Sequence, residues 1–388
     1  MKKLLTTAIA LSVAGGVTAA LADVSISGNV RFHYESWSDN NIDGATSGNN
    51  NTKMSSSTDI WVKGSHTSDS GLAYSGEVRL HQNDGDRVYV SLSDDWGKFN
   101  LGQDWSPVYS KSLGADWRGT VTASGAPDPS RKRVMTSSYA TTTSGKSNKI
   151  AYYTPSLGGF SAGLSMADGG AESKGDSTEY VLQYALPVMN GNMTFSYGGA
   201  NQNAADDKPA SKKTANSEMG LAFDSGPWLV SFVQITSEKT PNKKMTPKVE
   251  GALPVYVDVD DASDVTTDGV QRLNDKEKTA RVVAVAASDN LKEKQSASEF
   301  EVAYDVSDNL TVNLVVFDAK VSEGENKDDK YSSNAIGAKY TIAPGLYVSL
   351  AQTSFKYTDN THAAAEAAKK GTGNNKGNGL KLRVNVDL

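Results

Sequence analysis

The chemistry that this sequence offers most clearly is electrostatic, because basic side chains recur at alternate positions of short apolar segments. Arg79, for example, lies between Val78 and Leu80. Successive side chains of a β-strand point to opposite faces, so this arginine would lie opposite the apolar face of its strand. The basic residues with such a placement are Arg31, Lys63, Arg79, Arg87 and Lys149. A surface that carries charges of one sign beside apolar, low-dielectric material attracts ions of the opposite sign. The pattern of these residues therefore indicates a role in selecting ions rather than in covalent chemistry.

Residues for covalent or metal chemistry are sparse. The chain has no Cys and four His, which are His33, His66, His81 and His362, and it contains no G-x-S-x-G, H-E-x-x-H or P-loop sequence. Two scattered strand histidines, His33 and His81, do not define a nucleophile and its base. The acidic run at 258–268 lacks EF-hand spacing and is typical of a solvated loop. We therefore expect no enzymatic activity, no cofactor and no bound metal.

The elements that would position the charges are short alternating strands, and residues 379–388 are the clearest example. Leu380, Leu382, Val384, Val386 and Leu388 alternate with Lys381, Arg383, Asn385 and Asp387. One face is therefore aliphatic and the other polar. A half-buried strand of a soluble sheet shows the same alternation. A strand of a membrane barrel, apolar toward lipid and polar toward the lumen, shows it as well.

The N-terminal segment and the composition favour the membrane barrel. Residues 1–22 combine Lys2 and Lys3, an apolar run and the small-x-small sequence Ala20-Leu21-Ala22, as a cleaved secretory signal does. Without this segment, 37 Lys and Arg stand against 45 Asp and Glu, so there is no basic excess to indicate nucleic-acid binding. Beyond residue 22 no apolar run reaches the ~18 residues of a membrane helix. Hydrophobic residues make up only 38% of the chain, which fits a barrel with a polar lumen.

The connections between the alternating segments differ in length in an ordered way. Short connections are expected at 68–71, 95–97, 155–159, 187–191, 224–227, 306–309 and 343–345. Long ones are expected at 37–57, 104–148, 168–176, 200–215, 238–296, 321–332 and 358–378, with 83–86 short where a long one is due. Short turns at one end and long loops at the other are the barrel arrangement. We therefore predict an all-β, antiparallel, transmembrane β-barrel of sixteen strands over residues 23–388, closed by pairing 379–388 with 24–34. Eighteen strands is the alternative, if 255–257 and 281–287 also span the membrane.

At this point the chain resembles the Gram-negative general porins, most sharply between Thr58 and Tyr153. The sequences that carry the resemblance are Asp59-Ile60-Trp61-Val62-Lys63-Gly64-Ser65, Arg87-Val88-Tyr89-Val90-Ser91-Leu92, Trp96-Gly97-Lys98-Phe99-Asn100-Leu101-Gly102 and Asn148-Lys149-Ile150-Ala151-Tyr152-Tyr153. Two positions depart from the family pattern. Gln103-Asp104 stands where an Arg usually follows, and the chain ends on Leu388 rather than on an aromatic residue.

The resemblance implies a water-filled outer-membrane channel for passive diffusion of ions and small hydrophilic solutes. It also implies that the third long loop, 104–148, folds into the lumen and narrows it. Candidate residues for the constriction are then the five basic wall residues together with Gln103, Asp104, Asp116, Arg118 and Asp128, and Arg87 matches the arginine of the family's fourth strand most directly. Partners implied are the lipid bilayer, lipopolysaccharide, two further copies in a homotrimer and the barrel-assembly machinery.

Two other functions stay open at this stage. A substrate-specific channel would carry a low-affinity site for one class of solute on its wall or loops. A surface adhesin or receptor would act through the long extracellular loop 238–296. Saturable flux would favour the first, and a binding phenotype that depends on that loop would favour the second.

Overall fold

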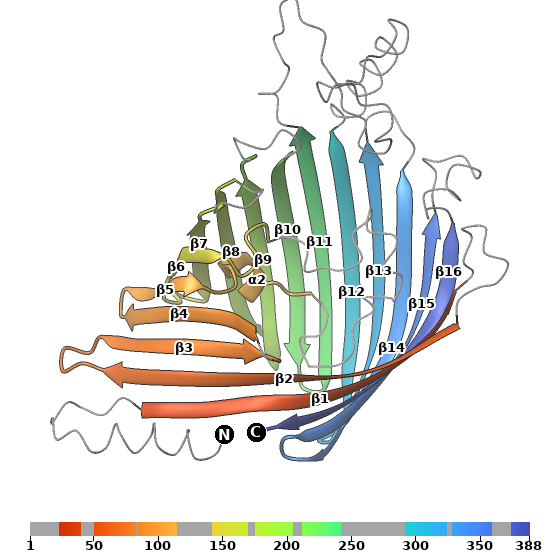
Figure 1. Ribbon diagram of the computed structural model, residues 1–388, viewed down its shortest axis with the longest axis horizontal. Coiled ribbons are helices and arrows are strands. Elements are labelled where there is room, and N and C mark those ends of the chain that lie inside the picture. The colour runs from red at the N-terminus through yellow and green to blue at the C-terminus, as the bar shows by residue number, and fades with distance from the viewer. Residues whose placement is uncertain are drawn as a thin grey trace, which may run out of the picture.

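The computed structural model describes residues 23–39, 50–82, 84–114, 142–169, 175–204, 212–241, 292–323, 328–358 and 374–388. Sixteen antiparallel strands form a closed barrel in which each strand pairs with its neighbours in the sequence (Figure 1). The strands are β1 (Asp23–Asp39), β2 (Asn50–Thr67), β3 (Ala73–His81), β4 (Asp84–Asp94), β5 (Gly97–Gln103), β6 (Asn148–Tyr153), β7 (Phe160–Ala167), β8 (Ser177–Val188), β9 (Gly191–Gln202), β10 (Lys212–Ser225), β11 (Trp228–Pro241), β12 (Glu293–Ser307), β13 (Leu310–Glu323), β14 (Asp329–Ala343), β15 (Leu346–Thr358) and β16 (Asn375–Asp387). One short helix, α2 (Pro107–Ser110), follows β5.

The barrel closes where the sequence predicted, by pairing the last strand with the first. Val30 lies opposite Val386, and Tyr34 lies opposite Leu382. Gly28 and Leu388 exchange both backbone hydrogen bonds, at 3.2 and 2.8 Å. Closure removes both sheet edges, so every strand has a partner on each side. The count of sixteen is confirmed, and the segments of the eighteen-strand alternative, 255–257 and 281–287, lie outside the described residues.

The two faces of the wall differ in polarity, as the alternation predicted. On β14 the outward Ile336 is 68% exposed, whereas its inward neighbour Ala335 is 1% exposed. Outward Leu350 and Leu380 are likewise exposed, while inward Ser349 and Asn385 are buried. Exposed apolar surface costs about 25 cal/mol per Å² in water, so an outer face of this kind is suited to hydrocarbon.

Several strands run further than the sequence predicted. The connection expected at 37–57 spans only 40–49, because β1 continues to Asp39 and β2 already begins at Asn50. β11 likewise continues to Pro241, and β12 begins at Glu293. Backbone pairing does not depend on apolar side chains, so strands extend beyond the apolar band with Ser, Thr and Lys on their outer face. The alternation of apolar and polar residues therefore reveals only the part of a strand that lies within the apolar band of the outer face.

Short turns gather at one end of the barrel, which we call the turn end; the opposite end is the loop end. The turn between β2 and β3 is closed by hydrogen bonds between Ser68 and Leu72 and between Gly71 and Ser68, both of 2.9 Å. The exceptional short connection between β3 and β4 is confirmed, since β3 ends at His81 and β4 begins at Asp84. Gln82 adopts a positive φ of 57° there, as tight turns require.

The height of the wall changes around the barrel. β5, β6 and β7 have 7, 6 and 8 residues, whereas β12 and β14 have 15 each. The long connection between β5 and β6 begins at this low part of the wall. Figure 1 shows α2 on the inner side of the wall, beside β7, β8 and β9. The low strands and this first helix frame the candidate site.

Candidate functional site

Asp59 on β2 is the centre of an ion-pair cluster on the inner wall. Its Oδ2 lies 3.1 Å from an Arg31 guanidinium nitrogen, and its Oδ1 lies 2.9 Å from Arg79. His81 Nδ1 lies 2.7 Å from the same Oδ1. The three partners come from the flanking strands β1 and β3, which place them around one carboxylate. A buried carboxylate that is paired in this way fixes the positions of its basic neighbours.

The cluster continues over β4 and β5. Asp86 accepts from Arg79 at 2.8 Å and also pairs with Lys146. Asp104 Oδ1 lies 3.3 Å from Arg87, and its Oδ2 accepts from the Asn100 amide at 2.9 Å. We call the six residues that alternate in charge across the wall the charge ladder: Arg31, Asp59, Arg79, Asp86, Arg87 and Asp104.

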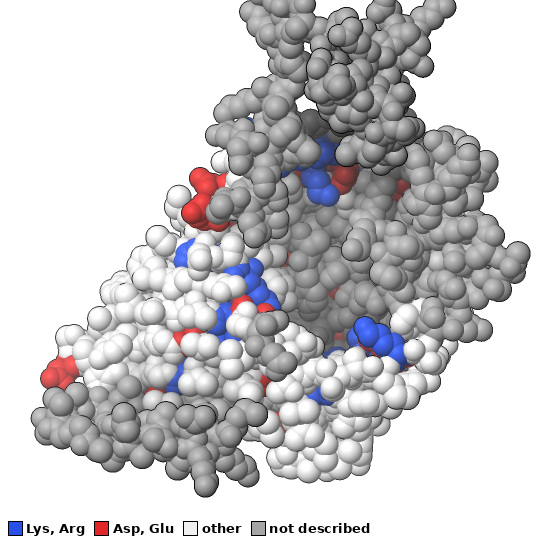
Figure 2. Space-filling view, in the orientation of Figure 1, with Lys and Arg blue, Asp and Glu red and all other residues white. Residues whose placement is uncertain are grey.

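Within the charge ladder the acidic groups lie deeper than the basic ones. The Asp59 side chain is 1% exposed, against 27% for Arg31. Asp104 is 8% exposed, against 18% for its partner Arg87. The guanidinium groups therefore present more surface to the interior than the carboxylates beneath them. Figure 2 shows Lys, Arg, Asp and Glu side by side on the hollow face, near the position of α2.

The first residues of the long connection pack on the inner wall. Ser106 caps α2 by accepting from the Tyr109 N–H at 3.5 Å, and Pro107 occupies the first turn, where no N–H is needed. Gly163 and Gly198 face this helix. A Cβ at Gly163 would lie 2.5 Å from Pro107 Cβ, and one at Gly198 would lie 2.6 Å from a Val108 methyl. The missing side chains leave the room that α2 occupies.

The segment after α2 is held by one polar side chain, Lys111, and one apolar side chain, Leu113. The Lys111 ammonium donates to Ser161 Oγ at 3.0 Å and to Gln183 Oε1 at 3.2 Å. Burial lowers the pKa of Lys111 below its ordinary value, and the nearby charge of Lys98 lowers that pKa further. Leu113 is buried against β10, where a Cβ at Gly220 would lie 3.1 Å from it.

The end of the connection returns to the same wall. Glu179, which is buried on β8, accepts from the backbone N–H of Thr143 at 3.0 Å and of Ser144 at 2.7 Å. Lys149 donates to the carbonyl oxygen of Gly145 at 2.8 Å and to that of Asp104. A single buried lysine thereby ties the two ends of the connection together.

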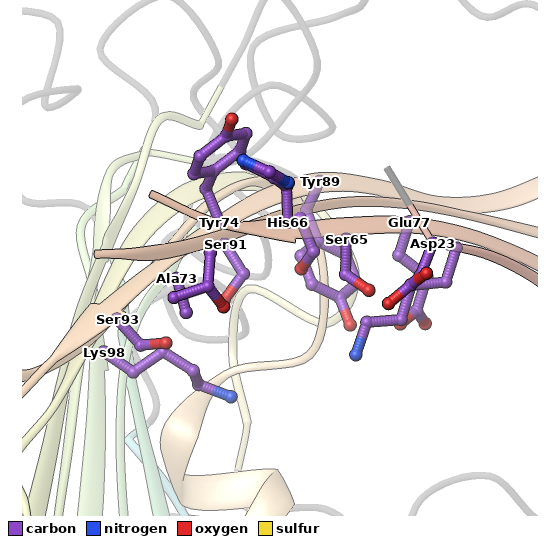
Figure 3. A pocket seen from close by; sticks show the side chains of 13 residues that line it. Asp23, Ser65, His66, Ala73, Tyr74, Glu77, Tyr89, Ser91, Ser93 and Lys98 are labelled. Carbon is purple, nitrogen blue, oxygen red and sulfur yellow. The ribbon is translucent and has the colours of Figure 1, made fainter. Parts of the chain in front are cut away.

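A polar recess of about 430 Å³ lies on the inner wall at the turn end (Figure 3). Hydroxyl groups line its middle, since Ser65 pairs with Ser75 and Ser75 with Ser91 across neighbouring strands. Figure 3 shows Lys98 at one end of the recess and Glu77 with Asp23 at the other. The arrangement offers charges of both signs and hydroxyl groups to a small polar solute.

The structure brings together part of the predicted residue set. Arg31, Arg79, Arg87 and Asp104 belong to the charge ladder. Lys149 is buried at the base of the long connection, and Lys63 lines the turn-end recess. Gln103 is paired with Val88, whose side chain points outward, so Gln103 lies at an outward position of the barrel wall. Asp116, Arg118 and Asp128 lie outside the described residues.

The sequence analysis missed Asp59, Asp86 and Lys146 of the ion-pair cluster, and also Lys111 and Glu179, which hold the long connection on the wall. The sequence did contain a sign that Asp59 faces inward, because Asp59 lies four positions before Lys63 on the same strand. Its partner in the neighbouring strand is Asn29, which lies two positions before the inward Arg31. Asp86 lies beside a turn and Lys146 lies in a loop. At such positions the alternation of apolar and polar residues does not predict which way a side chain points.

Among the described residues, no group of three or more His, Cys, Asp or Glu is arranged to hold a metal ion. No helix in this part of the chain is long and apolar enough to cross a membrane.

A closed barrel with an apolar outer face and a charged inner wall defines a membrane channel of the β-barrel class. The family comparison agrees: residues 6–363 match the model for the Gram-negative porins, and the chain belongs to that family. It is therefore an outer-membrane channel protein. No curated protein matches the chain.

Solved structures with the same fold have little sequence identity. The Vibrio cholerae outer-membrane protein OmpT with loop L8 deleted is 12% identical, at a TM-score of 0.61, over 94% of this chain and 99% of its own. Salmonella typhi OmpF in complex with daunomycin is 13% identical, at 0.59, over 96% and 99%. An anion-selective porin from Comamonas acidovorans is 16% identical, at 0.57, over 95% and 100%. At these identities the likeness establishes the fold.

Proposed function

We propose that the charge ladder and the loop 104–148 form the constriction of this porin and select ions by charge as solutes diffuse through passively. The observation that carries the proposal is the burial of Asp59 and Asp104 beneath their more exposed arginine partners. A water-filled passage bounded by low-dielectric walls focuses the field of such charges. Net charge of the chain matters less than the charges at the narrowest section.

The loop contacts support the same proposal. The helix α2, Lys111 and Leu113 pack on inward positions of β7 to β10, and the loop returns to Glu179 and Lys149. Both ends of the loop are thus held on the inner wall. We propose that a loop anchored in this way narrows the lumen. Asp116, Arg118 and Asp128 belong to the same loop, and we propose them as further constriction charges.

Reconstitution of the pure protein into planar lipid bilayers tests the channel. We expect stepwise increases in current whose size is proportional to voltage, since a preformed aqueous passage conducts without a gate. A protein that inserts into the bilayer in folded form and produces no current steps would contradict the proposal.

A second candidate is a channel with a low-affinity site for one solute class, and the turn-end recess favours it. Lys98 lies at one end of a row of serine hydroxyls, and Glu77 and Asp23 lie at the other, together with Lys63, which is paired in register with Glu77. Such a site would bind a small solute that carries both charges. Current block that saturates for one solute class is expected from this candidate, whereas unspecific diffusion gives flux proportional to concentration. The 242–291 part of the long loop lies outside the described residues, and nothing described favours an adhesin.

Export and assembly are proposed on the sequence and on the neighbours. Residues 1–22 would be removed as a signal peptide, and the barrel-assembly machinery would insert the mature chain. The OmpT neighbour of Vibrio cholerae is described in a trimer form, which supports a homotrimer here. We propose the bilayer and lipopolysaccharide as further partners, with no nucleic acid.

A further inference from the structure

Five inward side chains at the loop end of the barrel form a continuous apolar row. Ile235 on β11 is paired with Ala297 on β12, and Ala297 is paired with Ala319 on β13. Ala319 is paired with Tyr331 on β14, and Tyr331 with Tyr357 on β15. All five belong to one buried cluster, and none is more than 6% exposed. We call Ile235, Ala297, Ala319, Tyr331 and Tyr357 the inner apolar row.

The burial of this row is unexpected on the wall of a water-filled passage. On β1 and β3, by contrast, the inward Arg31 and His81 side chains are 27% and 43% exposed. Neighbouring strands shield only the sides of an inward side chain, so an apolar sheet face is buried by a further layer of the protein. Of the described loop residues, Leu113 is part of the same cluster, but one side chain does not cover five strands. The inner apolar row therefore calls for another covering segment.

The connection 242–291 has the position and the sequence of such a segment. It leaves the wall after Pro241 at the end of β11 and returns before β12, and both strands carry the inner apolar row. It contains two apolar runs, Val255-Tyr256-Val257 and the residues from Val282 to Ala287. The sixteen described strands already close the barrel, so these runs have no place in the wall. Apolar runs and an apolar wall both gain free energy by leaving water together.

The other long connections near this end are less suited to cover the row. Residues 115–141 contain four basic residues and no apolar run longer than two residues. Residues 359–373 have alanine as their only apolar residue type. The connection 242–291 can also reach the row, because the fourteen residues from Pro241 to Val255 extend up to about 45 Å at ~3.3 Å per residue.

We propose that the two apolar runs of the connection 242–291 pack on the inner apolar row, inside the loop end of the barrel. Ala297 and Ala319 leave a depression between Ile235 and Tyr331, and larger side chains such as Tyr256 and Val285 fill it. The acidic run 258–268, which lies between the two apolar runs in the sequence, stays in water. The lumen is thereby narrowed a second time, beside β11 to β15. The proposal rests on the proposed function only in taking the lumen to be water-filled.

Disulfide formation in the full-length folded barrel tests this packing, because the chain has no Cys of its own. A disulfide requires two Cβ atoms about 3.5–4.5 Å apart. The variants are Tyr256→Cys/Ala319→Cys and Val285→Cys/Ala297→Cys, and Tyr256→Cys/Ser55→Cys is the matched control with its second position inward on β2. Under mild oxidation we expect both variants to form the disulfide about tenfold faster than the control, because packing raises the effective concentration of the two thiols. Mass spectrometry of tryptic peptides measures the disulfide fraction.

A third pair reports the competing segment. Val134→Cys/Ala319→Cys should form its disulfide no faster than the control, since residues 115–141 are not expected to cover the row. Rapid formation in this pair and in neither of the first two would overturn the proposal, and so would equal rates in all four pairs. Circular dichroism verifies that each variant forms the barrel, and either of the first two pairs suffices if the other does not fold.

Planar-bilayer conductance separates a failure of this inference from a failure of the channel function. Normal current steps in a folded barrel whose first two pairs form no disulfide defeat only the inference. Disulfides in those pairs together with a folded barrel that passes no current defeat only the channel function.

Discussion

Asp59 shows how a single buried group can organise charges that face water. Its carboxylate contacts Arg31, Arg79 and His81 from two different strands. A long basic side chain has many rotamers, and pairing with a buried carboxylate restricts them. We infer that Asp59 sets where two guanidinium groups of the charge ladder lie.

Replacement of Asp59 by Asn should destabilise the barrel and make its lumen more positive. The variant keeps the shape but leaves Arg31 and Arg79 without their common partner, and breaking a buried ion pair in this way costs about 3 kcal/mol. Urea titration of the protein folded in vesicles measures the free energy of unfolding. Asp69→Asn, in the exposed turn between β2 and β3, should leave that free energy unchanged. Equal stability of the two variants would show that Asp59 is not a structural centre.

The same residue marks what sequence reasoning can reach at this scale. Alternation told correctly that Arg31, Arg79 and Arg87 share the inner face, because the side of a strand follows from parity alone. Alternation does not predict which side chains of neighbouring strands contact one another, because those contacts depend on the register between the strands. For this reason the role of Asp59 was not predicted. Gln103 was included because it follows Gly102, although it shares the parity of the outward Leu101, and the structure keeps it in that outward register opposite Val88.

Strand β16 gives the clearest test of the outer face at the scale of an element. Leu382 is paired with Tyr34 on one side and Leu350 on the other, all with outward register. A lysine on the lipid face near mid-membrane costs about 2–4 kcal/mol, so Leu382→Lys should lower stability in vesicles by that amount. Lys381→Met changes the adjacent inward side chain, whose ion pair with Glu35 is partly exposed, and should cost less than ~1 kcal/mol. Similar losses for both variants would mean that the faces have been assigned wrongly.

The glycines beneath α2 test how the loop is held. A Cβ at Gly163 would lie 2.5 Å from Pro107, and overpacking of this kind costs about 1–3 kcal/mol. Gly163→Ala should displace α2 while the strands stay folded, so single-channel conductance should rise or become variable. Gly76→Ala is the matched control, because a Cβ at Gly76 meets nothing within 4 Å. Unchanged conductance in Gly163→Ala would separate α2 from the constriction.

Strand ends and loops set the limit of prediction for the elements. The apolar part of each strand could be recognised from alternation, whereas the polar extensions of β1 and β2 to Asp39 and Asn50 could not. Those extensions are specified by backbone pairing with a neighbour, which a single segment does not reveal. The role of Gly163 and Gly198 also needed the structure, because an isolated strand glycine has several explanations.

At the scale of the whole molecule, closure and charge placement depend on each other. Sixteen strands fix the circumference of the wall, and the pairing of β1 with β16 brings Arg31 beside Asn385 at 3.3 Å. Strand number and closure were predictable because alternation and the spacing of turns repeat along the entire chain. The loop residues Asp116, Arg118 and Asp128 have no such repeat, and their roles stay predictions.

The central claim is that selectivity is set locally by the charge ladder. The most direct test is the reversal potential in a salt gradient for Arg87→Glu and for Lys213→Glu. Both variants change the net charge by the same amount, but Arg87 faces the interior and Lys213 is exposed on the outer face of β10. We predict that Arg87→Glu shifts the reversal potential toward cations and that Lys213→Glu leaves it at the wild-type value. Equal shifts in both variants, or none in Arg87→Glu, would contradict the account.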